Sequence, residues 1–273
     1  MARRPRTRPL VLAALALLVA ALVGAFMYRE DLIQTVNAQA LVDAGLDGRL
    51  ACHRVNRPAK LDALLRLGLR SFEVDLLVRD KGAEVYFEVG HDAKDARGLT
   101  FDELLERTRS SDVKKIWLDV KNLNDDNIDA ALRELERLDT AFDLKEIVIV
   151  ETSAQSAALA RLSLAGFHTS YYLPTGRIKK LLADADTAGM RSEAARIAEQ
   201  TRQQQIAAVS FDSALYPFVK QHLEPTIDAR VVYHTWYSIQ LWRWGAVERL
   251  RDKPYFGDER MRTILYSCKT TGG

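Results

Sequence analysis

The stretch RLACHRVNRPAKLDALLRLGLRSFEVDLLV, residues 49–78, decides the expected fold. Its two ends, residues 49–55 and 69–78, are short runs rich in β-branched, aromatic and other apolar residues, which is typical of strands. Between them, in residues 59–67, apolar side chains recur at i, i+3 and i+4, which indicates a helix with one packed face. The stretch therefore predicts a strand, a helix and a second strand.

The same alternation continues to the end of the chain. Six further strands are expected at residues 114–121, 146–152, 168–173, 207–212, 229–236 and 262–268. Six further helices are expected at residues 100–110, 127–138, 154–165, 192–205, 216–223 and 240–250. Eight strands alternating with seven helices predict an α/β fold of the (β/α)8 TIM barrel type. The alternative is an open doubly wound sheet, but no GxGxxG motif follows the first strand.

Composition excludes several classes of protein. The 273 residues are 48% hydrophobic and 28% charged, which is the composition of a folded chain and not of a disordered one. Four of the 39 basic residues lie in the first eight positions, so 35 basic residues face 37 acidic ones in the remainder. Nucleic-acid binding requires clustered cations, and this balance argues against a nucleic-acid partner.

The amino terminus predicts a single membrane-spanning helix. Residues 10–27 are apolar and uncharged, and 18 residues are just long enough to span hydrocarbon. The four arginines before them keep residues 1–8 in the cytoplasm and place the rest outside it. We expect an anchor at 9–28, a linker at 29–47 and the barrel at 48–273, in a single-pass cell-membrane protein. The alternative is a cleaved signal peptide and a secreted barrel.

Only two cysteines are present, Cys52 and Cys268, and they lie near opposite ends of the exported part. An oxidising compartment would permit a bond between them. Two cysteines by themselves do not reveal a pairing, so we expect two ordinary buried thiols.

Polar residues gather where strands of the predicted barrel end, which is where barrels carry their chemistry. The first strand ends in His53-Arg54-Val55-Asn56, and residues 79–98 form an insertion whose length favours a function and which contains His91. Glu73 and Asp75 lie two apart on the second strand, so both side chains point to the same face. Their apolar neighbours must face the helices, which places this pair inside the barrel.

Two buried carboxylates repel each other unless a cation or a proton lies between them. A hard divalent ion with oxygen ligands, Mg²⁺ or else Ca²⁺, is the expected solution, because no zinc-type Cys or His spacing is present. Asp119 and Lys121 repeat the spacing of two on the third strand. Asp119 is expected to complete the metal site, and Lys121 either meets a bound anion or pairs with Asp119.

These motifs, in this order, resemble the phospholipase C-like phosphodiesterase superfamily. The resemblance is closest to the sphingomyelinase D / phospholipase D toxins and their bacterial relatives, and the glycerophosphodiester phosphodiesterases and menorin-like proteins share the plan. It covers residues 48–122. Val55 stands where the glycerophosphodiesterase pattern has glycine, and the cysteine pair of the toxin loop is absent from the insertion.

The resemblance implies a role for each matching residue. Glu73, Asp75 and Asp119 would hold one Mg²⁺. His53 and His91 would flank the phosphorus, one as nucleophile or general base and the other as general acid. Lys121 would stabilise charge on the phosphoryl oxygens. Arg54, Asn56 and Trp236 are expected to contact the substrate.

Aromatic residues after the seventh strand add a weaker indication. Trp236, Tyr237, Trp242 and Trp244 suit a bilayer interface or a choline-like cation, although Trp242 and Trp244 could equally be helix packing. We expect a membrane-anchored, Mg²⁺-dependent phosphodiesterase acting on a phospholipid or glycerophosphodiester. The alternatives are a non-catalytic barrel that binds a phosphorylated headgroup or a protein, and a glycosidase that needs no metal.

Overall fold

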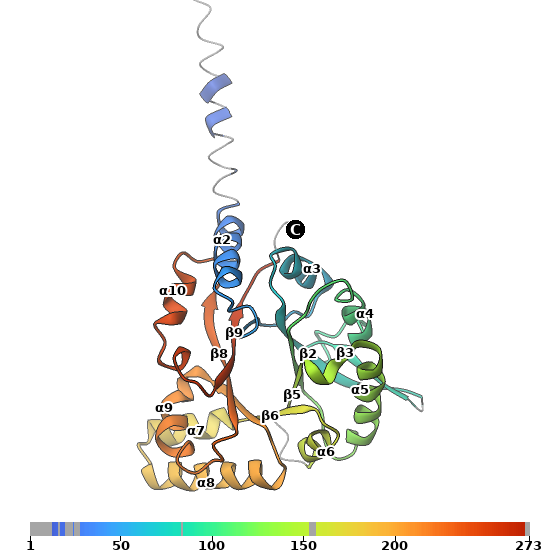
Figure 1. Ribbon diagram of the computed structural model, residues 1–273, viewed down its shortest axis with the longest axis vertical. Helices are drawn as coiled ribbons and strands as arrows, with labels where there is room; N and C mark the ends of the chain where they lie inside the picture. The colour runs from blue at the N-terminus through green and yellow to red at the C-terminus, as the bar shows by residue number, and fades with distance from the viewer. Residues whose placement is uncertain are drawn as a thin grey trace, which may run out of the picture.

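The computed structural model describes residues 13–15, 17–19, 24, 28–82, 84–152 and 157–270. Eight parallel strands form a sheet that closes on itself, because β1 pairs with both β9 and β2. Helices surround this barrel (Figure 1). The strands are β1 Leu50–Cys52, β2 Ser71–Lys81, β3 Glu84–Val89, β4 Lys115–Val120, β5 Val148–Thr152, β6 His168–Tyr172, β7 Ala208–Asp212, β8 Val232–Gln240 and β9 Met261–Ser267. The predicted TIM barrel and all eight of its strands are confirmed.

Helices follow the strands in the alternation that the sequence predicts. The α-helices are α2 Arg29–Asp43, α3 Pro58–Arg66, α4 Phe101–Glu106, α5 Ile128–Phe142, α6 Ala158–Leu164, α7 Thr175–Ala183, α8 Thr187–Gln203, α9 Tyr216–Phe218 and α10 Ala246–Arg251. Short turns of other helix types lie at Leu144–Glu146, Ser213–Leu215, Val219–Leu223 and Pro254–Phe256. Helix α7 was not expected, and α10 begins six residues later than predicted because β8 continues to Gln240.

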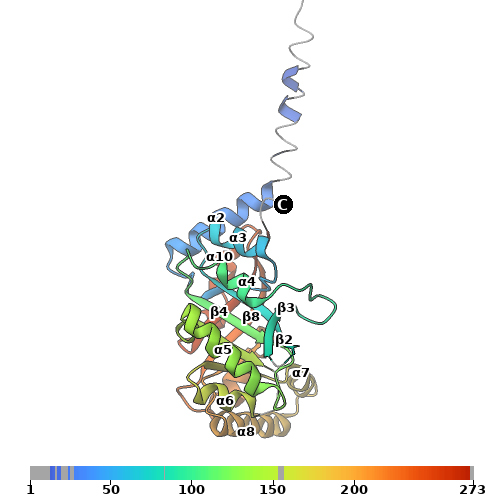
Figure 2. The same cartoon turned by 90° about the vertical axis from the view of Figure 1, so that its right-hand side faces the viewer.

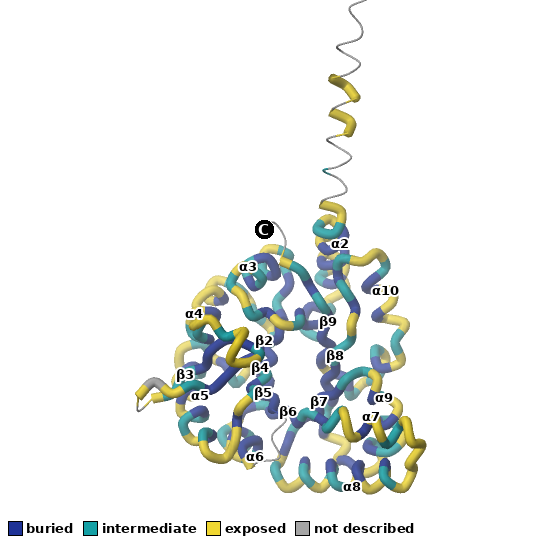
Figure 3. The backbone as a smooth tube through the Cα atoms, turned by 180° about the vertical axis from the view of Figure 1, so that it is seen from behind, coloured by how far each residue is buried: buried dark blue, intermediate teal, exposed yellow. Residues whose placement is uncertain are grey.

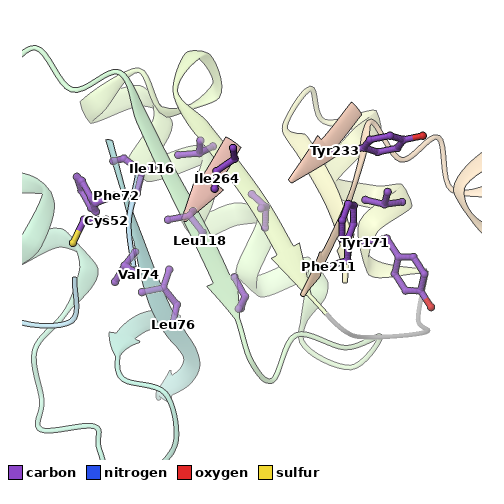
Figure 4. Packing of buried hydrophobic residues seen from close by; sticks show 14 of the residues in the cluster. Cys52, Phe72, Val74, Leu76, Ile116, Leu118, Tyr171, Phe211, Tyr233 and Ile264 are labelled. Carbon is purple, nitrogen blue, oxygen red and sulfur yellow. The ribbon is translucent and has the colours of Figure 1, made fainter. Parts of the chain in front are cut away.

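Strand side chains divide into two packed sets. Phe72, Val74 and Leu76 of β2 belong to the large core between strands and helices. Trp117, between two residues of that core, instead packs with Ala51 and Leu265 inside the barrel. Figure 3 shows the strands buried and the outward faces of the helices exposed, and Figure 4 shows Phe72, Val74, Leu76, Ile116 and Leu118 in the outer core. The intervening residues of β2, Glu73 and Asp75, therefore face the interior, as the alternation predicts.

The insertion at residues 79–98 contains a strand that the sequence analysis did not expect. Strand β3 pairs antiparallel with β2, with Leu76 opposite Val89 and Val78 opposite Phe87, and it lies outside the closed barrel (Figure 2). Phe87 and Val89 are buried, which stabilises the hairpin. The loop that carries His91 is consequently shorter than its sequence suggested.

The expected linker at residues 29–47 is also corrected, because residues 29–43 form helix α2. Asn37 Nδ2 donates hydrogen bonds to the carbonyl oxygens of Leu241 (2.7 Å) and Arg243 (2.9 Å), just beyond β8. Gln34 exchanges two hydrogen bonds with the main chain of Lys269, just beyond β9. Buried polar residues break the apolar periodicity of α2, so the helix could not be recognised from its pattern.

Cys52 and Cys268 form a disulfide, which corrects the expectation of two thiols. The two Cα atoms lie 5.8 Å apart although 216 residues separate them in the chain. Closure of the barrel brings them together, since β1 and β9 are neighbours and Cys52 lies opposite Tyr266.

More than half of the predicted membrane span at residues 9–28 lies outside the described residues. Among the helices that the structure describes, none has both the length and the apolar character needed to cross a bilayer.

Candidate active site

Three carboxylates meet at the carboxyl ends of neighbouring strands. In the register of β2 with β4, Asp75 lies directly opposite Asp119, and Glu73 precedes Asp75 on the same face. Each residue offers one carboxylate oxygen within 4.8 Å of the others, so the three could hold one metal ion. The predicted metal-ligating set is thus brought together by strand pairing.

The carboxylate of Glu73 is buried and only one of its two oxygens has a hydrogen-bond partner. Its side chain is almost fully buried, and its Oε2 accepts a hydrogen bond from the main-chain N–H of Arg54 (2.5 Å). Its Oε1 is buried without a hydrogen-bond partner. Burial and the nearby charges of Asp75 and Asp119 raise the pKa of Glu73 well above its usual value. A divalent cation would relieve both the repulsion and the unpaired oxygen.

Lys121 bridges the other two carboxylates. Its Nζ lies 2.8 Å from Asp75 Oδ1 and also donates to Asp119 Oδ2. Burial raises the pKa of Asp75, but the charge and hydrogen bonds of Lys121 outweigh that effect and lower it overall. The pKa of Asp119 is raised, because burial prevails over the opposing effect of Lys121. Lys121 thus pairs with Asp119, which was the alternative to its predicted contact with a bound anion. That anion contact stays a prediction.

Asn56 and Arg54, both expected to contact substrate, also support the carboxylates. Asn56 Nδ2 donates to Asp75 Oδ2 (2.7 Å), and its Oδ1 accepts from the Asp75 main chain (3.0 Å). Arg54 has a φ of +56°, in the left-handed region that non-glycine residues rarely adopt. This conformation accompanies the main-chain hydrogen bond from Arg54 to Glu73.

The two predicted catalytic histidines line one cavity of about 350 Å³. His53 follows β1, and its Nε2 lies 3.7 Å from Glu73 Oε2. Burial lowers the pKa of His53 to about 4, and the charge of Arg54 acts in the same direction, so the imidazole is neutral near pH 7. His91 follows β3, where the preceding Gly90 N–H donates to the Asp75 carbonyl (3.0 Å). Both imidazoles therefore lie beside the carboxylate cluster.

The other wall of this cavity is aromatic. Trp236 of β8 and Tyr172 of β6 stack with ring centroids 5.2 Å apart. Trp236 thus lines this cavity, and its contact with substrate stays a prediction. Trp244 is 55% exposed and outside the cavity wall, and Trp242 packs under Lys269, so neither belongs to this site.

Sequence reasoning missed three residues of the site. Glu151 of β5 lies opposite Asp119, is buried, and accepts a hydrogen bond from Ser210. Lys60, in the first turn of α3, donates to the His53 carbonyl (2.7 Å). Tyr172 ends β6. Glu151 and Tyr172 could have been found from their places at the ends of predicted strands, but nothing local marks Lys60.

Comparison with solved structures identifies the fold. A protein from Agrobacterium tumefaciens assigned as a glycerophosphoryl diester phosphodiesterase matches with a TM-score of 0.54 at 12% identity, covering 81% of this chain and 92% of that one. A glycerophosphodiester phosphodiesterase from Parabacteroides distasonis matches with a TM-score of 0.52 at 11% identity and the same coverage. The fold is that of the glycerophosphodiester phosphodiesterases. The predicted likeness to the glycerophosphodiester phosphodiesterases is confirmed at the level of the fold.

A third match has a bound product. A phosphodiesterase from Oleispira antarctica, in complex with the product sn-glycerol-3-phosphate, matches with a TM-score of 0.52 at 10% identity, covering 81% of this chain and 92% of that one. No protein-family model and no curated protein sequence matches the chain. At identities this low, the shared feature is the architecture of the barrel.

Proposed function

We propose that the protein is a membrane-anchored, metal-dependent phosphodiesterase that cleaves a phospholipid or a glycerophosphodiester. The observation that carries the proposal is the meeting of Glu73, Asp75 and Asp119 at one point, with His53 and His91 in the same cavity. Carboxylates supply the oxygen ligands of a hard cation, and imidazoles transfer protons near neutral pH. This combination suits cleavage of a phosphate ester.

The residues present fit a divalent cation. Glu73, Asp75 and Asp119 would hold Mg²⁺, or else Ca²⁺, and the unpartnered Oε1 of Glu73 supports this assignment. When bound, the ion would polarise a phosphoryl oxygen. Asn56 fixes the orientation of Asp75, which keeps the ligand set organised.

The remaining residues of the cavity have complementary tasks. One of the two imidazoles, His53 or His91, acts as nucleophile or general base, and the other protonates the leaving alkoxide. Lys121 stabilises negative charge on the phosphoryl oxygens. Arg54 contacts the phosphodiester, and Trp236 with Tyr172 covers one substituent of it. If the imidazole acts as base, water or a hydroxyl group of the substrate attacks the phosphorus and the alkoxide leaves. If the imidazole is the nucleophile, it displaces the alkoxide, and water or the hydroxyl group then displaces the imidazole.

A membrane anchor agrees with the position of α2. The hydrogen bonds of Gln34 and Asn37 hold the middle of α2 at the carboxyl ends of β8 and β9, the same end of the barrel as the candidate site. Tyr28, Leu32 and Val36 recur every four residues and are 66%, 62% and 47% exposed. An anchor at residues 9–28 would therefore direct the catalytic cavity toward the bilayer, and the disulfide agrees with an extracytoplasmic location.

Deletion of residues 1–27 tests the anchor. The full chain is expected to sediment with membranes and to resist extraction at alkaline pH, whereas the shortened chain should stay in the supernatant. Equal partitioning of the two proteins would contradict the anchor and leave the phosphodiesterase proposal standing.

The activity is tested on the full chain in detergent micelles. Phosphodiesters with choline, ethanolamine and glycerol headgroups are incubated with Mg²⁺, and the products are separated by phosphorus NMR, which distinguishes a hydrolysed monoester from a cyclic phosphate. We expect turnover that is abolished by EDTA and by His53→Ala, and that is retained by the exposed control variant Glu106→Gln on α4.

Binding of phosphodiesters with no turnover under any divalent ion would instead favour a non-catalytic barrel. Turnover that persists in EDTA would contradict the metal. Hydrolysis of glycosides without metal would favour the hypothesis that the protein is a glycosidase.

A further inference from the structure

A second cavity, of about 750 Å³, adjoins the catalytic cavity, and Arg54 lines both. The first turn of α3 forms one wall, and the loop after β3 forms another. The segment that follows β9 runs past α3 and completes the cavity near Cys268 (Figure 1). We refer to this cavity as the basic groove.

Charge in the basic groove is strongly unbalanced. Arg54, Arg57, Lys60 and Arg97 contribute four cations to its lining, and Asp95 contributes one carboxylate. Such a concentration of cations is unusual in a chain whose basic and acidic residues nearly balance. These cations therefore create a local positive electrostatic potential that attracts anions next to the catalytic cavity.

Two of these arginines have side chains that form no hydrogen bond or ion pair with the described part of the chain. Within the described part of the chain, the side chains of Arg57 and Arg97 have no hydrogen-bond or ion-pair partner, and both residues are exposed. Arg107 with Asp62 and Arg137 with Asp102 are examples of exposed arginines that are paired, whereas Arg133 and Arg191, among the described residues, are as unpaired as Arg57 and Arg97 but lie away from the groove. Unpaired guanidinium groups on the wall of a cavity are suited to bidentate recognition of a phosphate.

The two walls around the scissile position differ in character. Trp236 and Tyr172 contribute aromatic surface to the catalytic cavity, whereas Arg54 is shared with the basic groove. A phosphodiester held between them would place one substituent on the aromatic wall and the other among the cations.

We propose that the basic groove is a substrate subsite for a second phosphate, so that the enzyme prefers phosphodiesters in which one substituent carries a further phosphate group. The inference rests on the proposed phosphodiesterase function and extends it to a substrate class. Arg57 and Arg97 bind the distal phosphate, and Arg54 lies between the two phosphates. The aromatic wall receives the substituent without the second charge.

The test compares two substrates on the full chain in neutral detergent micelles with Mg²⁺. The first is glycerophosphoglycerol, and the second is the same diester with a phosphate on one terminal hydroxyl. The measured quantity is the ratio of kcat/KM for the second substrate to that for the first. We expect a ratio well above one for the unmodified protein.

The double variant Arg57→Gln/Arg97→Gln should lower this ratio by about tenfold for each arginine that binds the distal phosphate. The control Arg133→Gln/Arg191→Gln removes the same charge from exposed positions on α5 and α8, and it should preserve the ratio. A ratio near one in the unmodified protein, or an equal fall in both double variants, would overturn the subsite.

Calorimetry with inorganic phosphate in EDTA separates the possible failures. Phosphate binding that is weakened by Arg57→Gln/Arg97→Gln but not by the control supports an anion site in the groove. If phosphate binds there while the substrate ratio is near one, the groove takes free phosphate, and the substrate subsite is overturned. If no phosphodiester is hydrolysed, the proposed function fails, and loss of phosphate binding in the double variant still decides whether the anion site exists.

Discussion

Glu73 is a residue whose charged form lowers the stability of the metal-free fold and whose carboxylate is a candidate metal ligand. Its carboxylate is almost fully buried, one oxygen accepts from Arg54, and the other has no partner. Because burial and two neighbouring acids raise its pKa, the charged form destabilises the metal-free fold. Buried carboxylates persist at such positions when a ligand requires them.

Replacement of this carboxylate by its amide should separate stability from activity. We expect Glu73→Gln to stabilise the protein in EDTA by about 1–3 kcal/mol, because an amide is neutral and can still accept the Arg54 hydrogen bond. Phosphodiesterase activity with Mg²⁺ should fall by about a hundredfold or more, since one charged ligand is lost. Urea unfolding in EDTA and initial rates measure the two effects. The control Glu106→Gln should change neither, and a destabilised Glu73→Gln protein would contradict this explanation.

At the scale of elements, a disulfide and several side-chain hydrogen bonds connect segments from near the two ends of the chain beside the candidate site. The disulfide joins the end of β1, immediately before His53, to the segment that follows β9. Helix α2 is fastened to the same end of the barrel through Gln34 and Asn37. The position of His53 therefore depends on contacts between residues more than 200 positions apart.

Removal of the disulfide should destabilise the barrel and disturb His53 together. The variant Cys52→Ser/Cys268→Ser is expected to lose about 2–4 kcal/mol of unfolding free energy, because the bond closes a very long loop in the unfolded chain. Its kcat should also fall, since the end of β1 is less constrained. A reducing agent should shift the unfolding midpoint of the natural protein toward that of the variant and leave the variant unchanged. A midpoint unaffected by reduction would argue against the bond.

Asn37 is one of the two buried polar side chains through which α2 is hydrogen-bonded to the barrel. Asn37→Ala leaves the carbonyl oxygens of Leu241 and Arg243 without their donor, which is expected to cost about 1–3 kcal/mol. Gln39→Ala is the matched control on the same helix, because Gln39 is exposed and bonds only within α2. Equal unfolding free energies of the two variants would show that α2 contributes little to the barrel.

The whole barrel is polarised between its two ends. Acidic residues and two imidazoles gather at the carboxyl ends of the strands, whereas His168 and His234 lie toward the amino ends of β6 and β8, with their Nε2 atoms 3.4 Å apart. Trp117 packs on His234, with ring centroids 5.4 Å apart, and closes the interior between these regions. Burial lowers the pKa of His234 well below 6.5, and the charges of His168 and Lys115 act in the same direction.

The contribution of His234 to stability should therefore fall in mild acid. Below pH 6.5 the unfolded state protonates His234 while the folded state does not, so folding loses about 1.4 kcal/mol per pH unit from this group until its folded pKa is reached. His234→Leu should remove that contribution. We expect the stability advantage of the natural protein over His234→Leu to be smaller at pH 5 than at pH 7 in urea unfolding. The control His222→Gln, at a partly exposed position, should track the natural protein, and parallel pH profiles for all three would contradict the assignment.

The sequence by itself determined the local pattern: eight strands, the helices between most of them, and the shared face of Glu73 with Asp75. These follow from periodicities of two and 3.6 residues, which depend on a few neighbouring side chains. His53, His91 and Trp236 could be named because each lies at or near the end of an element.

Only the tertiary structure decided which distant residues meet. The register that sets Asp75 opposite Asp119, the disulfide between Cys52 and Cys268, the docking of α2 and the cations of the basic groove all depend on barrel closure. Such contacts result from packing and hydrogen bonding summed over the whole barrel. No short stretch of sequence contains that information, because the partners lie tens to hundreds of residues apart.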